Sequence, residues 1–225
     1  MEGKPRKLLI QANRNGFFYV LDRANGKLLL AKPFIKKLTW AKEIGPDGRP
    51  VLNPNQVPTE KGTSVCPTIL GGTNWWSAAF DPAQGLYFVH AMEGCSIFVK
   101  GEGEWESGHS FMGGSSRMAP SDPPERILRA IDISTGKIAW ELPETGPGES
   151  RSGTLATTGG VVFFGDDSGS LRVVDSKTGE SLWSFQAGQQ QIRASPMTYV
   201  FDNQQFVALA TGSNIIAYGL MSGKE

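Results

Sequence analysis

Short runs of hydrophobic side chains, several of them alternating with polar ones, recur along the whole chain. They end at glycine, proline, aspartate or asparagine. A period of two residues between turn-forming residues is typical of β-strands, and no stretch carries a convincing helical period. The pattern therefore predicts an all-β chain, with strands at residues 8–13, 17–22, 76–81, 86–91, 161–166, 197–202 and 205–212.

One strand–turn–strand pattern occurs twice, with a weaker third copy. Residues 128–140 read LRAIDISTGKIAW and residues 171–183 read LRVVDSKTGESLW, so the two final tryptophans lie 43 residues apart; residues 17–30 lack the tryptophan. In each full copy an aspartate precedes a Thr-Gly pair, whose glycine tolerates a positive φ. The pattern predicts a β-hairpin in which the aspartate accepts hydrogen bonds from the turn and the indole packs on the neighbouring unit.

The spacing of the repeat favours a β-propeller. About 43 residues suit one four-stranded blade, and radial repetition of blades protects sheet edges. At this period the 225 residues make about four to five blades. A β-sandwich is the alternative, and the repeat disfavours it. We expect residues 1–225 to form one partial propeller domain with no separate second domain.

Charge and composition exclude some functional classes. Lys plus Arg balance Asp plus Glu at 22 each, so the chain shows no overall bias toward nucleic acid. No apolar run reaches the roughly 18 residues of a membrane helix. Residues 1–50 hold eleven basic against four acidic residues, which we interpret as a solvated basic face. The sequence passes from Met1 almost directly into a strand without a signal peptide, so we expect a piece of a longer protein.

The hairpin form Asp-x-x-Thr-Gly-x-x-x-Trp resembles the tryptophan-docking motif of the quinoprotein alcohol dehydrogenases. These enzymes are eight-bladed propellers that bind pyrroloquinoline quinone (PQQ) and calcium on the propeller axis. Four blocks of this chain are similar to segments of their C-terminal half: residues 6–29, 66–89, 153–185 and 194–213. The resemblance implies that the chain is the C-terminal half of such a propeller.

The resemblance assigns cofactor contacts to Arg14, Asn74 and Trp75. Arg14 stands where the family has a basic residue that reaches the quinone oxygens, and a cation there would stabilise the negative charge that develops on them. Asn74 matches an asparagine that hydrogen-bonds to the cofactor, after two glycines that let backbone approach a flat ligand. Of Trp75 and Trp76, one is expected to line the axial pocket and the other to pack between blades. The local sequence alone favours an exposed turn arginine at Arg14, and an ordinary turn asparagine is the alternative at Asn74; the family resemblance favours the cofactor role of Arg14.

Arg151 departs from the family pattern. It stands where many members have a tryptophan that faces the cofactor, so it either takes over a polar contact or marks a blade that no longer lines a working pocket. Asn214 likewise replaces a tryptophan of some members, and we expect it to face the axis. Because of both departures, the family resemblance does not identify the substrate.

The two cysteines, Cys66 and Cys95, match a structural disulfide of some family members. A zinc site formed with His90 and His109 is the rival interpretation. Its spacings lack the close ligand pair of structural zinc sites, which disfavours it. Residues 165–169 read GDDSG, which predicts a tight turn because the spaced oxygen ligands of an EF-hand loop are missing.

The resemblance implies a PQQ-dependent oxidoreductase that oxidises alcohols and passes electrons to an acceptor in the bacterial periplasm. In the family, the calcium ligands and the general-base aspartate lie upstream of the segment that resembles residues 1–16. We therefore expect this chain alone to hold no metal site and to be inactive, and to form homo-oligomers through exposed blade edges. The alternative is a non-catalytic PQQ-like propeller that serves as a scaffold or binding module.

Overall fold

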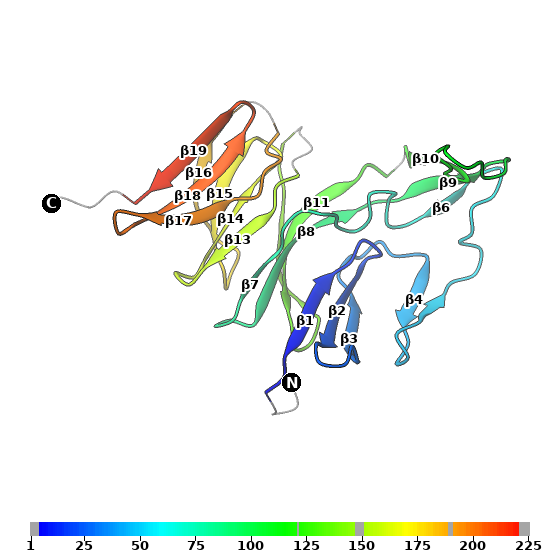
Figure 1. Cartoon of the computed structure of the whole chain (residues 1–225), viewed down its shortest axis with the longest axis horizontal. Coiled ribbons are helices and arrows are strands. Elements are labelled where there is room, and N and C mark those ends of the chain that lie inside the picture. The colour runs from blue at the N-terminus through cyan, green and yellow to red at the C-terminus, as the bar shows by residue number, and fades with distance from the viewer. Residues whose placement is uncertain (1–4, 121, 147–150, 189–190, 221–225) are drawn as a thin grey trace. The chain divides into compact units, whose positions relative to one another are not determined.

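The computed structural model describes residues 5–120, 122–146, 151–188 and 191–220 (Figure 1). These residues form nineteen β-strands and no helix, which confirms the predicted all-β class. No membrane-spanning helix is found among them. The chain divides into two compact units: the first comprises Met1–Asn74, Ala91–Arg126 and Ile133–Lys137, and the second comprises Trp75–His90, Ile127–Asp132 and Ile138–Glu225.

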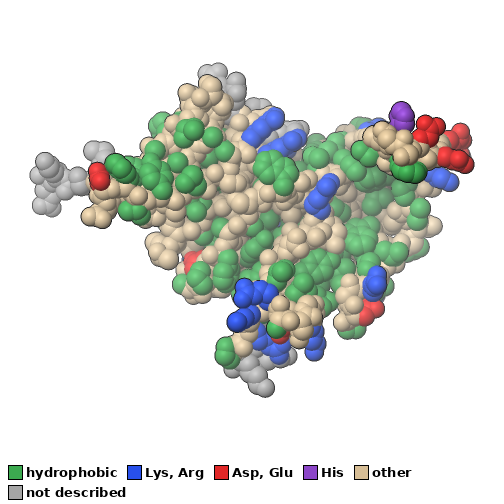
Figure 2. Space-filling model, in the orientation of Figure 1, with side chains coloured by type: hydrophobic (Ala, Val, Ile, Leu, Met, Phe, Trp, Pro, Cys, Tyr) green, Lys and Arg blue, Asp and Glu red, His purple; other side chains and the backbone are tan. Residues whose placement is uncertain are grey.

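The first unit contains three small antiparallel sheets, ordered β1-β2-β3, β4-β5 and β10-β9-β6. Its strands are β1 (Leu8–Ala12), β2 (Phe17–Asp22), β3 (Leu28–Pro33), β4 (Ala41–Ile44), β5 (Pro50–Leu52), β6 (Thr63–Val65), β9 (Ser96–Lys100) and β10 (Gly114–Met118). Figure 2 shows Lys and Arg side chains near β1–β3, and Lys7, Arg23, Lys27 and Lys32 are exposed there. The basic N-terminal stretch is thus solvated, as its charge pattern predicts.

The second unit contains two four-stranded sheets, ordered β12-β11-β8-β7 and β13-β14-β15-β16, and a three-stranded sheet, β17-β18-β19. Its strands are β7 (Ala79–Asp81), β8 (Leu86–Glu93), β11 (Glu125–Asp132), β12 (Ile138–Pro143), β13 (Thr154–Thr157), β14 (Val161–Gly165), β15 (Ser170–Asp175), β16 (Ser181–Gln186), β17 (Met197–Phe201), β18 (Gln204–Thr211) and β19 (Asn214–Gly219). One end each of β8 and β11 is assigned to the first unit.

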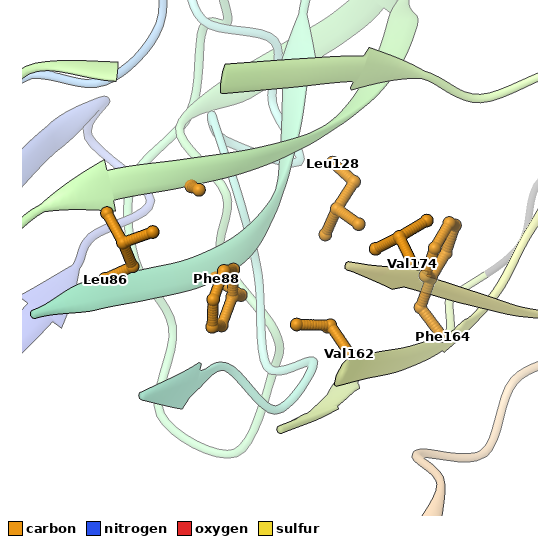
Figure 3. Close-up of a cluster of buried hydrophobic side chains, with 7 residues drawn as sticks. Leu86, Phe88, Leu128, Val162, Phe164 and Val174 are labelled. Atoms are coloured by element: carbon orange, nitrogen blue, oxygen red, sulfur yellow. The ribbon is translucent and has the colours of Figure 1, made fainter. Parts of the chain in front are cut away.

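The two four-stranded sheets share a hydrophobic core (Figure 3). Alternate residues of these strands point into it, such as Leu86 and Phe88 on β8, Leu128 and Ala130 on β11, and Val162 and Phe164 on β14. The cluster comprises Leu86, Phe88, Leu128, Ala130, Val162, Phe164 and Val174. Burial of this apolar surface packs the two sheets face to face.

The repeated pattern forms a hairpin in all three places: β2–β3, β11–β12 and β15–β16. Each hairpin also carries a register shift directly before its aspartate, between Val20 and Leu21, Ala130 and Ile131, and Val173 and Val174. The three copies therefore share a β-bulge as well as a turn, and the bulge increases the local strand twist.

The indole of Trp140 packs on the turn of the next hairpin, as predicted. Its Nε1 donates to the backbone oxygen of Ser176 at 3.0 Å. Gly179, at φ +75°, lies so close that a Cβ atom there would be 2.7 Å from the indole ring. Glycine is therefore needed twice at this position, for its backbone conformation and for the space it leaves.

The Gly-Asp-Asp-Ser-Gly segment is a turn between β14 and β15, as expected. The Oδ1 atom of Asp166 accepts hydrogen bonds from the backbone amides of Ser168 and Ser170 at 3.0 and 3.1 Å, and from the Ser168 hydroxyl. This carboxylate is buried and serves the turn itself.

Candidate functional site

Arg14 lies at the turn between β1 and β2, in direct contact with the glycine segment that precedes Asn74. The backbone oxygen of Arg14 accepts a hydrogen bond from the amide of Gly72 at 2.8 Å. A Cβ atom at Gly71 would lie 2.7 Å from that same oxygen. The close approach is possible because residue 71 has no side chain and holds φ at +90°.

The side chains of Arg14 and Asn74 both bind backbone oxygens of this segment. Nη2 of Arg14 donates to the carbonyl of Ile69 at 2.5 Å. Nδ2 of Asn74 donates to the carbonyl of Leu70 at 2.8 Å. Two candidate residues that are far apart in sequence therefore meet in one place within the first unit.

The segment from residue 66 to 74 is anchored at several points. Cys66 forms a disulfide with Cys95, and the Cys66 amide donates to the hydroxyl of Thr39 at 2.9 Å. Further along, the amide of Ile69 donates to Oγ of Ser96 at 3.0 Å, and Met92 donates to the backbone oxygen of Gly72 at 2.8 Å. The disulfide consumes both cysteines, so neither is available as a zinc ligand.

His90 was a further member of the rival zinc set, and it has a different partner. Its Nδ1 lies 2.5 Å from a carboxylate oxygen of Glu144, and both side chains are buried. Its ring also packs against Phe164 at a centroid distance of 5.7 Å. His90 is thus part of a buried polar pair in the second unit.

Trp75 and Arg151 belong to the second unit, so their relation to Arg14 and Asn74 stays a prediction. The Trp75 side chain is 67% exposed, which leaves its ring accessible to a ligand. Arg151 is half-buried, and its backbone amide donates to Ile192 at 2.9 Å. Asn214 begins β19 and is exposed.

The charge and hydrogen-bond donors of Arg14 suit an anionic quinone. Arg14 is exposed and supplies a positive charge with several N–H donors. The neighbouring Gly71 and Gly72 are buried, because the Arg14 turn and Ile35 fill the space beside them, and the half-buried Asn74 follows them. No group of three or more metal-ligating side chains occurs within the described ranges.

Two contributors to this site, Ile69 and Ser96, and a buried hydroxyl beside them carry no recognisable signal in the sequence. The carbonyl of Ile69 acts through the backbone, so its side chain does not reveal it. Ser96 is fully buried, yet a lone serine at a strand start is unremarkable in sequence. Thr73 is 3% exposed, and its hydroxyl has no hydrogen-bond partner in the structure.

Comparison with known proteins points to one family. A family model described as the β-propeller domain of glucose/ethanol/alcohol dehydrogenases (PQQ) matches residues 106–207. The quinoprotein alcohol dehydrogenase PedH of Pseudomonas putida is 37% identical over 219 residues, which is 93% of this chain and 36% of that protein.

Solved structures agree with the sequence comparison. A europium-containing methanol dehydrogenase superposes with a TM-score of 0.82 and 34% identity, over 93% of this chain and 37% of that one. The quinohemoprotein alcohol dehydrogenase of Comamonas testosteroni superposes with a TM-score of 0.81 and 32% identity. The match covers 95% of this chain and 33% of that one.

The chain is similar to quinoprotein alcohol dehydrogenases over nearly its whole length. It spans about a third of the length of the relatives that it matches, a smaller share than the half expected from the sequence. Its sheets are those of a β-propeller segment.

Proposed function

We propose that this chain is part of a PQQ-dependent oxidoreductase that oxidises alcohols. The observation that carries the proposal is the meeting of Arg14 and Asn74 on residues 69–74. Homology to alcohol and methanol dehydrogenases supports it. The alcohol and the electron acceptor would be partners of the whole enzyme.

PQQ, when bound, would supply the chemistry by accepting two electrons from the alcohol. Arg14 would hold the quinone oxygens and stabilise the charge on them, and Asn74 would orient the ring by a hydrogen bond. Trp75 and Arg151 are proposed further contacts. Calcium is the proposed metal, and we place its ligands and the general base outside this chain, which alone would be inactive.

The test is a titration of the purified chain with PQQ and calcium, followed by cofactor absorbance. Saturable binding is expected, with affinity reduced about tenfold or more in Arg14→Ala, because a charge-assisted hydrogen bond contributes roughly 1.5–3 kcal/mol. Asn74→Ala should weaken it less. Arg49→Ala is the matched control, since that arginine is exposed and lies elsewhere in the same unit. Absence of binding by a folded chain would refute the proposal and favour a scaffold.

We also propose a periplasmic location and self-association. The Cys66–Cys95 disulfide supports the first, because disulfides persist in oxidising compartments. Exposed apolar side chains on the edge strands of the second unit support self-association, since such edges invite pairing. They include Leu182, Trp183, Phe185, Met197, Val200, Phe201 and Ile215.

A further inference from the structure

The turn before β9 is linked to Arg14 through a short series of contacts within the first unit. Cys95 bonds to Cys66, and the next residue, Ser96, accepts the amide hydrogen of Ile69 at 3.0 Å. The carbonyl of the same Ile69 accepts the guanidinium of Arg14 at 2.5 Å. The Ile69 residue is therefore held at its amide and binds Arg14 at its carbonyl.

We propose that Cys95 and Ser96 position Arg14. Arg14 is exposed on a turn, and a long exposed side chain samples many rotamers unless a partner holds it. The Ile69 carbonyl is such a partner only while the chain around residue 69 stays in place. Ser96 fixes its amide and the disulfide fixes the chain three residues earlier, so the guanidinium is held before any ligand arrives.

The main chain of the Arg14 turn depends on the same segment. Gly72 donates to the backbone oxygen of Arg14, and the backbone oxygen of Gly72 accepts from Met92, four residues before Ser96. Both the backbone and the side chain of Arg14 are thus hydrogen-bonded to residues 69–72. Pre-organisation of this kind raises affinity because less ordering remains to be done on binding. Only the expected gain in quinone affinity rests on the proposed function.

The first test compares Ser96→Ala with Ser116→Ala, an exposed serine on β10 in the same unit. Amide hydrogen exchange at Ile69 and Gly72 should accelerate about tenfold in the first variant only, because a local hydrogen bond is lost. The ¹⁵N signals of the Arg14 guanidinium should move toward those of a free arginine. Exchange in β14 and β15 should not change. Unaltered Ile69 exchange, or faster exchange throughout the chain, would overturn the proposal.

The second test breaks the other anchor. A small dithiol is oxidised to its cyclic disulfide while the sulfurs of Cys66 and Cys95 each gain a hydrogen. Reduction, or the Cys66→Ser/Cys95→Ser variant, should accelerate exchange at Ile69 and release the Arg14 signals while β14 and β15 stay protected. Global loss of protection would show a general stabilising role and overturn the positioning role.

A PQQ titration of the same variants separates this proposal from the proposed function. If the unaltered chain does not bind PQQ but the exchange and guanidinium signals respond as expected, the proposed function fails and the positioning role stands. If PQQ binding is lost in Arg14→Ala but keeps its affinity in Ser96→Ala, the positioning role alone is overturned. The expected result is an intermediate loss, about threefold to tenfold, in Ser96→Ala.

Discussion

Asp175 fixes the turn of its hairpin through one oxygen. Its Oδ1 accepts the backbone amides of Lys177 and Thr178 at 2.8 and 2.9 Å, and the Thr178 hydroxyl at 3.1 Å. These hydrogen bonds, the Thr178 amide foremost, lower the pKa of Asp175 because they favour its charged form. The folded protein therefore binds this proton more weakly than the unfolded chain does.

Asp175→Ala should destabilise the protein at neutral pH, and the loss should shrink in acid. Since the folded pKa lies below the unfolded value of about 3.8, the carboxylate contributes fully above that value. The contribution disappears as the pH falls through the folded pKa. Urea unfolding between pH 7 and pH 3 measures the gap in unfolding free energy between the two proteins.

The control for this series is Glu180→Gln, an exposed acid of the same turn. It should show almost no gap at any pH. A gap for Asp175→Ala that stays constant or widens below pH 4 would mean that the carboxylate does not hold the turn through its charge.

At the level of secondary-structure elements, Trp140 connects two neighbouring hairpins. Its indole meets Gly179 of the next turn, donates to Ser176, and lies 5.8 Å from the Phe88 ring in the shared core. Trp105, by contrast, is 66% exposed. Trp140 therefore links the hairpin on β11–β12 to the one on β15–β16.

Trp140→Ala should lower the free energy of unfolding by about 3 kcal/mol, because a large ring leaves a cavity between packed sheets. Trp105→Ala, the matched control, should change it by less than about 0.5 kcal/mol. Denaturant unfolding followed by far-UV circular dichroism measures both. Equal losses for the two variants would show that the Trp140 contact does not bind the hairpins together.

The hairpins could be predicted because their signals are local. Alternation, the aspartate and the Thr-Gly pair all act within about ten residues, and glycine at a positive φ leaves few alternative turns. The bulge in the second strand of each hairpin, at Leu29, Ala139 and Leu182, could not, since one extra residue in a strand hardly changes the pattern. The contact of Arg14 with Ile69 could not either, because a backbone carbonyl at a distance has no sequence signature.

For the whole molecule, the relation to the quinoprotein dehydrogenases followed from four sequence blocks, and the comparisons agree. The resemblance proposed Arg14 and Asn74 as separate cofactor contacts, and these contacts stay predictions. The structure shows that the two side chains donate to the backbone oxygens of Ile69 and Leu70. The resemblance gave no account of Ser96, because a positioning role depends on packing that only the three-dimensional arrangement reveals.

The exposed apolar face of the second unit predicts self-association of the whole chain (Figure 2). Met197 on β17 is 54% exposed and Ile215 on β19 is 82% exposed. They pair with Ala208 and Ala210 of β18, so both lie on the same face of this sheet. Sedimentation velocity should detect a concentration-dependent oligomer. Met197→Lys combined with Ile215→Lys should shift it toward monomer, since unpaired charges oppose edge pairing.

The control for self-association is Val57→Lys in the first unit, where the side chain is 74% exposed. It should leave the oligomer unchanged. Monomers of the unaltered protein at every concentration, or equal effects of the control and the double variant, would contradict an interface on this face.

The central claim is that Arg14, held by residues 69–74, forms one side of a quinone site. Its most direct test is a crystal structure of the chain grown with PQQ and calcium. We predict that the quinone oxygens lie within hydrogen-bond distance, about 2.7–3.2 Å, of the Arg14 guanidinium, with Asn74 beside the ring. A folded chain that binds PQQ away from Arg14, or excludes it at saturating concentration, would contradict the account.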